Sequence, residues 1–357
     1  MERLTPDQIK VAVLHADKKV RDLALRYFGM SCDADATVMP LVTQAYDRYG
    51  DEAFENPWIL PDLPQTVETV AWILQAIERV EAGSRTKESP FARNLICCLL
   101  RAEPTLLQHY SASIQGLRHL GDDSRIMIKN RLSAYAMPYD ELWKELFRIC
   151  EFNSHCEWMP LLENARCLSI VRALARFPEQ SSAEVLSILA DPSVLPSIHL
   201  EQYIIELIGL LRLNAAVPWL MYESNGVTYQ TLAMVGTDDV VWELVRGFDE
   251  GSWHGRDHMA YLLGDIHTDF SVRAALELAR EEGARLILSP EYEDAQASLL
   301  TAAVLNFAPC AIEPARQYIL GCDSSPTPDL RYYLLLACQI MGKTFPEYES
   351  WLEAGGT

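Results

Sequence analysis

Three phrases of the sequence decide the fold: IIELIGL at residues 204–210, TLAMVG at residues 231–236 and YLLGDI at residues 261–266. In each phrase an apolar stretch reaches a glycine, and a second apolar stretch follows along the chain. The glycines, Gly209, Gly236 and Gly264, are 27 and 28 residues apart. A fixed period in this range is typical of solenoids, whose units bury their apolar faces only against neighbouring units. The phrases therefore predict stacked helical repeats.

Helical patterns also fill the rest of the chain. Thr5-Pro6-Asp7 is a typical helix start, because threonine can cap backbone N–H groups and proline suits the first helical position. Further helices are predicted over residues 17–29, 35–49, 64–82, 91–101, 104–117, 123–136, 139–151, 158–175, 181–190 and 199–211. No alternating strand pattern competes with them. The chain is predicted to be all-α.

Length and composition allow a sizeable core. Hydrophobic residues make up 49% of the 357 residues and charged residues 22%, which is ordinary globular usage. We expect helical pairs over residues 1–84, degenerate helical repeats over 85–198 and regular repeats with an acidic surface over 199–357, as separate parts or as one continuous solenoid. The apolar connection at residues 56–64 is expected to pack Trp58, Ile59 and Leu60 onto the helices.

The charge of the chain is strongly acidic and unevenly distributed. The formal net charge is −20, and residues 201–357 carry 9 Lys and Arg against 23 Asp and Glu. Such a field attracts basic proteins, and it repels nucleic acid and anionic membrane surfaces. Between Lys144 and Lys343 every basic residue is an arginine, a side chain suited to fixed planar contacts with carboxylates. A basic protein partner is therefore expected.

Nine cysteines occur, and none forms a Cys-x-x-Cys pair. Several lie in apolar helical stretches, where cysteine serves as a small buried hydrophobe. The N-terminal stretch lacks an apolar signal-peptide core, and no stretch of about 18 apolar residues follows. These features predict reduced thiols, no membrane span and a cytoplasmic protein.

Two segments resemble the HEAT-like repeats, in which a loop aspartate and a Val-Arg pair open a helix. They are Asp17-Lys18-Lys19-Val20-Arg21 and Asp269-Phe270-Ser271-Val272-Arg273. The glycine-terminated stretches are similar to first-helix endings of the shorter, phycobilin-lyase-type variety of this family. The resemblance implies a right-handed α-solenoid of antiparallel helix pairs. In it Asp17 and Asp269 would cap helices, Val20 and Val272 would enter the core, and Arg21 and Arg273 would reach carboxylates.

The densest polar cluster is Trp253-His254-Gly255-Arg256-Asp257-His258, which Asp265, His267 and Asp269 follow. Together with Asp238 and Asp239 at a predicted helix start, the residues Trp253, His254, Arg256 and Asp257 are candidates for binding a partner. The four-residue spacing of two histidines suits a metal, but no His-Glu-x-x-His motif is present, so no metal is predicted. Most of the eight tryptophans are expected in the core, and any tryptophan on the concave face of the solenoid would anchor a partner.

Other chemical signatures fail on inspection. Gly342-Lys343-Thr344 resembles the end of a phosphate-binding loop, but the first glycine of that motif is missing, so a helix end is the better interpretation. No Gly-x-Ser-x-Gly motif is present. No catalytic residue and no cofactor are therefore predicted. A local basic strip runs through Arg118, Arg125, Lys129 and Arg131 and could touch phosphate, although the overall charge opposes nucleic-acid binding.

The sequence favours a non-catalytic scaffold that binds a basic protein along the solenoid surface. Two alternatives stay open. The first is an enzyme or lyase that acts on a small molecule and is built on the same solenoid. The second is a nucleic-acid-binding protein of the HEAT-like type, which would need the basic strip to form one continuous face.

Overall fold

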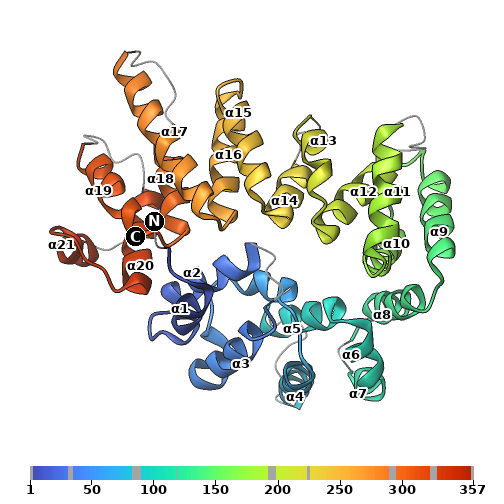
Figure 1. Cartoon of the computed structure of the whole chain (residues 1–357). Helices are drawn as coiled ribbons and strands as arrows, with labels where there is room; N and C mark the ends of the chain where they lie inside the picture. Colours follow the sequence, from blue (N-terminus) through green and yellow to red (C-terminus); the bar gives the residue numbers. More distant parts are fainter. Residues whose placement is uncertain are drawn as a thin grey trace. The chain divides into compact units, whose positions relative to one another are not determined.

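The computed structural model describes residues 3–30, 35–82, 90–118, 120–191, 198–222, 226–288, 295–321 and 328–354. These residues form helices joined by short connections, and no strand occurs among them (Figure 1). The predicted all-α class is confirmed, and the many helices are consistent with a helical repeat.

The helices follow one another along the chain with the following bounds. They are α1 (Pro6–Lys10), η1 (Val11–Leu14), α2 (Lys18–Met30), α3 (Val38–Tyr49), η2 (Gly50–Glu52), η3 (Pro57–Asp62), α4 (Val67–Ala82), α5 (Pro90–Arg101), α6 (Pro104–His109), α7 (Ser111–Gly116), α8 (Asp122–Tyr135), α9 (Tyr139–Phe152), α10 (Leu161–Leu174), α11 (Pro178–Ala190), α12 (Ile198–Leu211), η5 (Asn214–Ala216), α13 (Val217–Tyr222), α14 (Gly226–Val235), α15 (Asp238–Phe248), α16 (Trp253–Asp265), α17 (Asp269–Leu288), α18 (Gln296–Leu305), η6 (Pro309–Ala311), α19 (Ile312–Gly321), α20 (Pro328–Met341) and α21 (Tyr348–Glu353).

The helix starts obey local capping rules. The side chains and backbones of Thr5 and Gln8 form a reciprocal capping box at α1. At α2 the Asp17 carboxylate accepts a hydrogen bond from the N–H of Lys19 at 2.9 Å, as its position predicts. At α17 the prediction was wrong: the cap is Thr268, whose hydroxyl accepts from the N–H of Ser271 at 3.0 Å. Asp269 is instead the first residue of that helix.

The chain divides into two units that do not follow sequence order. Unit 1 contains residues 1–33, 44–56 and 236–357, and unit 2 contains residues 34–43 and 57–235. This grouping differs from the three consecutive segments expected, because the N-terminal helices pack against C-terminal ones. A local hydrophobic pattern shows which face of a helix is apolar, but not which distant helix will cover it.

In unit 2 alternate helices pack in a row. Helix α10 packs against α8 and α12, and α12 packs against α14. Arginines tie neighbouring helices together by donating to backbone carbonyls near helix ends. The guanidinium of Arg131 reaches the carbonyl of Ala102 at 2.7 Å, and that of Arg176 reaches the carbonyl of Tyr135 at 2.7 Å. The last carbonyls of a helix have no partner within the helix, so these contacts satisfy them.

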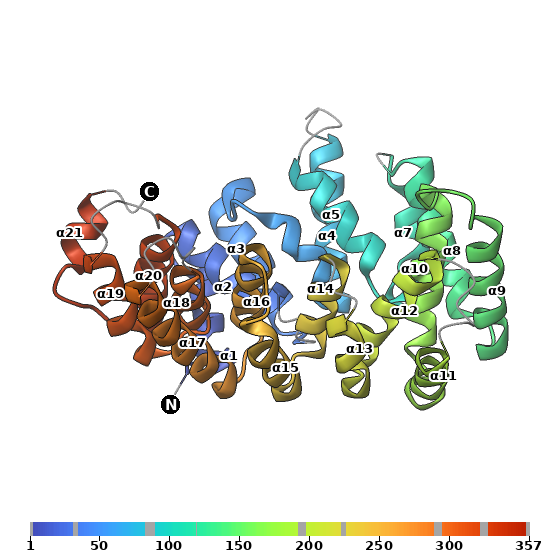
Figure 2. The same ribbon diagram turned by 90° about the horizontal axis from the view of Figure 1, so that it is seen from above.

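In unit 1 the N-terminal helix α2 joins the row made by the C-terminal helices. Helix α18 lies between α16 and α20, and α2 packs on α20 (Figures 1 and 2). Tyr27 of α2 stacks on the His267 ring, with ring centroids 3.7 Å apart, and also contacts the Phe307 ring. Arg26 donates to the Tyr333 hydroxyl at 3.1 Å. Helix α2 thereby covers apolar surface of the C-terminal helices.

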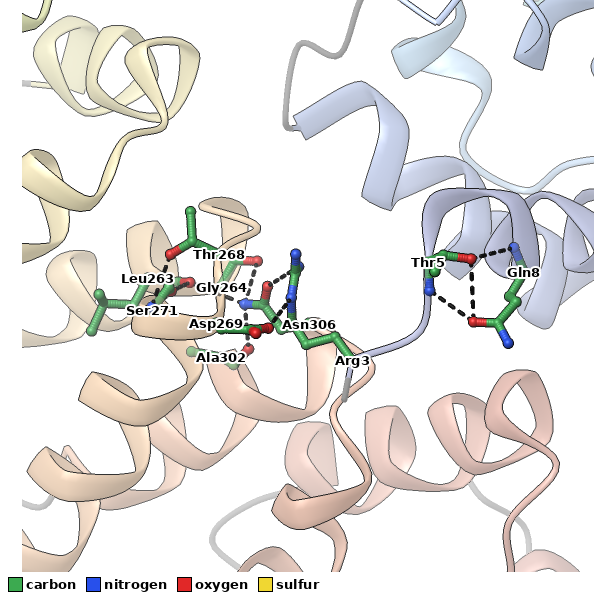
Figure 3. A network of polar contacts seen from close by, with 10 residues as sticks. All are labelled: Arg3, Thr5, Gln8, Leu263, Gly264, Thr268, Asp269, Ser271, Ala302 and Asn306. Carbon is green, nitrogen blue, oxygen red and sulfur yellow. Dashed lines mark hydrogen bonds and ion pairs between the residues drawn. The ribbon is translucent and has the colours of Figure 1, made fainter. Parts of the chain in front are cut away.

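The segment before α1 is fastened to the same helices. The N–H of Leu4 donates to the carbonyl of Phe307 at 3.2 Å. The Arg3 guanidinium contacts the Asp269 carboxylate at 3.2 Å and the Asn306 side-chain oxygen at 3.3 Å (Figure 3). Asn306 is buried and donates in turn to the carbonyls of Leu263 and Gly264. This network connects the start of the chain to α16, α17 and the end of α18.

The three periodic glycines have different roles. Gly236 follows α14 with φ at +60°, a left-handed conformation that suits glycine and ends the helix as predicted. Gly209 and Gly264 instead lie inside α12 and α16, where they permit close packing. A Cβ atom on Gly209 would lie 3.0 Å from the Met234 sulfur, and one on Gly264 would lie 3.1 Å from the Cα atom of Ala302. Close helix approach, more than helix ending, explains these two positions.

The connection at residues 56–64 folds as the 3-10 helix η3. Ile59 and Leu60 are buried in it, as expected, but Trp58 is 58% exposed. The prediction for Trp58 was wrong, because the short helix turns adjacent side chains in different directions.

Gly264→Ala is expected to lower the free energy of unfolding by about 1–3 kcal/mol, because the added methyl meets backbone of α18 that cannot move alone. Gly209→Ala is the matched control. It meets the flexible side chain of Met234, and alanine favours the helix interior by up to about 1 kcal/mol, so it should be neutral or stabilising. Urea unfolding followed by circular dichroism measures both, and an equal loss in the two variants would contradict the packing argument.

The two arginines of the repeated phrase should differ just as strongly. Buried Arg21 donates to the carbonyls of Ala53, His15 and Ala16 and lies 3.9 Å from the Tyr49 ring, whereas Arg273 is exposed. Arg21→Ala leaves buried carbonyls without a donor and should cost about 2–4 kcal/mol. Arg273→Ala should change stability by less than about 0.5 kcal/mol. Denaturant titration of both proteins compares these values, and similar losses would refute the distinction.

Candidate protein-binding surface

Among the described side chains of unit 1, the most exposed aromatic one lies on α15. This helix buries Val240, Val241, Leu244 and Phe248, which repeat at helical spacing on one face. Trp242 falls on the opposite face and is 62% exposed. The sequence left open which tryptophans are buried, and the burial pattern of its own helix places Trp242 outside the core. The spacing of the four apolar residues is the sequence signal that would have shown this.

The Trp242 side chain has a defined support. Its ring lies 5.3 Å, centroid to centroid, from the ring of Phe270 in the first turn of α17. The Arg273 guanidinium lies over the same Phe270 ring at 5.7 Å. Aromatic pairs of this kind add about 0.5–1.5 kcal/mol beyond area burial, so they restrict the orientation of the exposed ring. A restrained aromatic ring costs little entropy when a partner binds it.

Acidic residues lie one helical turn before Trp242 on α15. Asp238 and Asp239 occupy the first turn of α15, and both are exposed. The dipole of the helix stabilises carboxylates at this end. Asp249 follows the helix and pairs with Arg285 at 2.6 Å, a contact that lowers the pKa of the Asp249 carboxyl. We call Asp238, Asp239 and Trp242 the α15 surface.

The polar cluster on α16 turns partly inward. Arg256 is buried and forms an ion pair with buried Glu282 at 3.2 Å, and Arg285 contacts the same carboxylate at 3.0 Å. Burial raises the pKa of Glu282, while the two arginine charges lower it. This corrects the expectation that Arg256 faces a partner: it holds α16 to α17. A buried ion pair is costly to break, because the remaining charge loses its partner.

The other candidates of this cluster are placed as follows. Asp257 is half-buried and accepts a hydrogen bond from the Ser298 hydroxyl. Trp253 and His254 belong to α16, but their side chains lie outside the described residues. The structure therefore brings Asp238 and Asp239 together with Trp242, and it directs Arg256 and Asp257 toward contacts within unit 1.

His267 and Asp265 border a small recess between α16 and α2. The recess encloses about 200 Å³ including its open mouth, and Arg26 and Tyr27 also line it. Burial lowers the pKa of His267 to about 3, helped by the charge of Arg3 and opposed by a hydrogen bond with the Gly264 backbone. Burial raises the pKa of Asp265 to about 6, against the effect of Arg26. Pockets for small molecules usually enclose about 300–1,000 Å³, so the recess offers little room for a substrate.

Metal and phosphate chemistry find no further support in the part of the chain that is described. No group of three or more His, Cys, Asp or Glu side chains there could hold a metal ion. Gly342 has φ at +60°, and the N–H of Lys343 donates to the carbonyl of Cys338 at 2.9 Å. These contacts end α20 in the manner of a Schellman motif, which agrees with the interpretation as a helix end.

The predicted basic strip is not a continuous exposed face. Arg131 is buried against the Ala102 carbonyl, and burial lowers its pKa to about 10. Arg125 donates to the carbonyls of Gln115 and Leu117. Two of the four basic groups are thus engaged with backbone, which weakens the case for phosphate binding.

Comparison with models of protein families, with curated proteins and with solved structures found no match. Within the described residues, no helix combines the length and the apolar character needed to cross a membrane.

His267 and Asp265, the two titrating groups beside the recess, are expected to have opposite effects on how stability depends on pH. The folded-state pKa of His267 lies below its unfolded value of about 6.5, so its contribution to stability is lost as the pH falls below that value. Between pH 7 and pH 5 the wild type should therefore lose about 1–2 kcal/mol relative to His267→Phe, which retains a ring against Tyr27. Thermal and urea unfolding at the two pH values measure this difference.

Asp265→Asn provides the comparison of opposite sign. Because the folded-state pKa of Asp265 lies above its unfolded value, stability is lost as the pH rises through about 6. Over the same fall from pH 7 to pH 5 the wild type should gain about 1 kcal/mol relative to Asp265→Asn. Parallel pH profiles for the wild type and both variants would contradict these assignments.

Proposed function

We propose that this protein is a non-catalytic scaffold that binds a basic protein segment through the α15 surface. The observation that carries the proposal is the exposed ring of Trp242, held against Phe270 and flanked by Asp238 and Asp239. Exposed aromatic side chains dominate the energetics of many protein interfaces. The acidic residues would attract lysine and arginine, and they would speed the encounter.

The repeat architecture suits this role. We interpret the rows of alternate helices in each unit as antiparallel HEAT-like pairs of a right-handed solenoid, a class whose extended surfaces commonly bind other macromolecules. Buried Cys98, Cys167 and Cys338 are free thiols, which suits a cytoplasmic location. The recess is small, and two residues of the basic strip already contact backbone carbonyls. These features support an enzyme or a nucleic-acid-binding protein less than the α15 surface supports a protein-binding scaffold.

The proposal predicts that a purified basic partner, first recovered from nuclease-treated cell extract on the immobilised full-length protein, binds through α15. Trp242→Ala should weaken binding by about tenfold or more, as expected for an interface anchor. Asp238→Lys with Asp239→Lys should weaken it similarly and reduce the salt dependence of the dissociation constant. Isothermal titration calorimetry at low and high salt measures both effects.

The chain offers matched controls for each change. Asp122 and Asp123 form an equivalent exposed acidic pair in the first turn of α8, and Trp58 is an equally exposed tryptophan. Asp122→Lys with Asp123→Lys, and Trp58→Ala, should leave the affinity within about twofold. Binding that is indifferent to salt and to Trp242 would refute the proposed function.

A further inference from the structure

Unit 2 has an exposed apolar surface of its own where α9, α10 and α12 meet. Four large apolar side chains are far more exposed than is usual in this chain: Phe152 at 73%, Trp158 at 77%, Leu161 at 65% and Ile198 at 66%. Phe152 is the last residue of α9, whereas Leu161 and Ile198 are the first residues of α10 and α12. Contiguous apolar surface on a folded protein commonly marks an interaction site.

Two hydrogen bonds bring these residues to the same end of the helices. The His199 ring nitrogen Nε2 lies 2.9 Å from the carbonyl of Cys156, so the start of α12 lies beside the connection between α9 and α10. The Tyr203 hydroxyl, one turn further along α12, donates to the side-chain oxygen of Asn164 in the first turn of α10 at 2.7 Å. Because both contacts advance in the same direction, α10 and α12 run parallel.

The connection that presents Trp158 is held in place by its own hydrogen bonds. Asn153 is buried, and its side-chain amide donates to the carbonyl of Ile149 at 2.9 Å. The N–H of Cys156 donates to the carbonyl of Asn153 at 2.9 Å, which closes a turn before Trp158. The exposed residues thus rest on a fixed backbone. We call Phe152, Trp158, Leu161 and Ile198 the α9–α10 surface.

The charge around the α9–α10 surface specifies its partner. Residues 151–163 contain three glutamates and no lysine or arginine, and Glu151, Glu157 and Glu163 are all exposed. An apolar patch with an acidic rim is complementary to apolar side chains flanked by basic ones. Anionic lipid is disfavoured by the same charges. A second copy of the chain would bring identical acidic rims together.

We propose that the α9–α10 surface is a docking site for an amphipathic protein segment whose apolar face is flanked by lysine or arginine. The apolar face would cover Trp158, Leu161 and Ile198, and the basic residues would meet Glu151, Glu157 and Glu163. This proposal does not depend on the α15 surface, because every residue that carries it belongs to unit 2. Binding here should therefore survive Trp242→Ala.

The test uses the full-length protein and two fluorescently labelled synthetic peptides. Both are about 18 residues long, enough to form a helix, and carry leucine on one face; one has lysine flanks and the other glutamate flanks. Fluorescence anisotropy should show that the lysine peptide binds at least about tenfold more tightly than the glutamate peptide. The double variant Glu151→Lys with Glu157→Lys should weaken binding of the lysine peptide and strengthen binding of the glutamate peptide. A merely hydrophobic surface would not show this reversal.

Apolar contact is tested with a matched pair of double variants. The double variant Trp158→Ser with Leu161→Ser should weaken binding of the lysine peptide by about tenfold. The control is Trp58→Ser with Val67→Ser, because these two residues are also exposed and also in unit 2. It should change the affinity for the lysine peptide by less than about twofold. Circular dichroism melting verifies folding, and the glutamate reversal tests the proposal independently if the first variant unfolds.

Three outcomes would overturn the proposal. The two peptides could bind equally, or the control variant could lose as much affinity as Trp158→Ser with Leu161→Ser. Alternatively, sedimentation could show a dimer of the wild type that this variant converts to monomer, which would assign the surface to a second copy of the chain.

Discussion

Unit 1 depends on the burial of the aromatic face of α2 against helices from the other end of the chain. Tyr27 stacks on His267 and contacts Phe307, while Arg26 reaches Tyr333. A repeat at the end of an array has an apolar face with no following repeat to cover it. Here the first long helix supplies that cover, and the Arg3 network fastens the segment before α1. The stability of the last repeats is therefore linked to residues more than two hundred positions away in the sequence.

Arginine has a recurrent structural role in both units. Arg21, Arg131 and Arg176 each donate to carbonyls near helix ends, so the side chain of one helix completes the hydrogen bonds of another. The planar guanidinium has several fixed donors and stays charged when buried, which lysine does less well. The residue types in the sequence predict that arginines pair with carboxylates. Arg256 with Glu282 and Arg316 with Glu347 do so, whereas Arg21, Arg131 and Arg176 donate to carbonyls near helix ends instead.

The proposed binding surfaces share one physical character, an exposed aromatic ring set among carboxylates. Trp242 has Asp238 and Asp239, and Trp158 has Glu157 on the adjacent residue with Glu151 and Glu163 nearby in the chain. Some of the negative charge of the chain thus lies beside exposed apolar side chains. At these two surfaces carboxylates lie near accessible apolar side chains, and this combination would confer both affinity and selectivity for basic partners.

The sequence by itself determined the all-α class and most helix positions, because 3.6-residue periodicity and capping are local properties. Val20 and Val272 enter the core as the repeated phrase implies, and Asp17 caps α2. Only the tertiary structure decided that Gly264 permits contact with Ala302 and that Arg256 is buried. It also decided that the N-terminal helices join the C-terminal ones. Each of these depends on a neighbour distant in sequence, and an apolar or charged face carries no information about which neighbour will cover it.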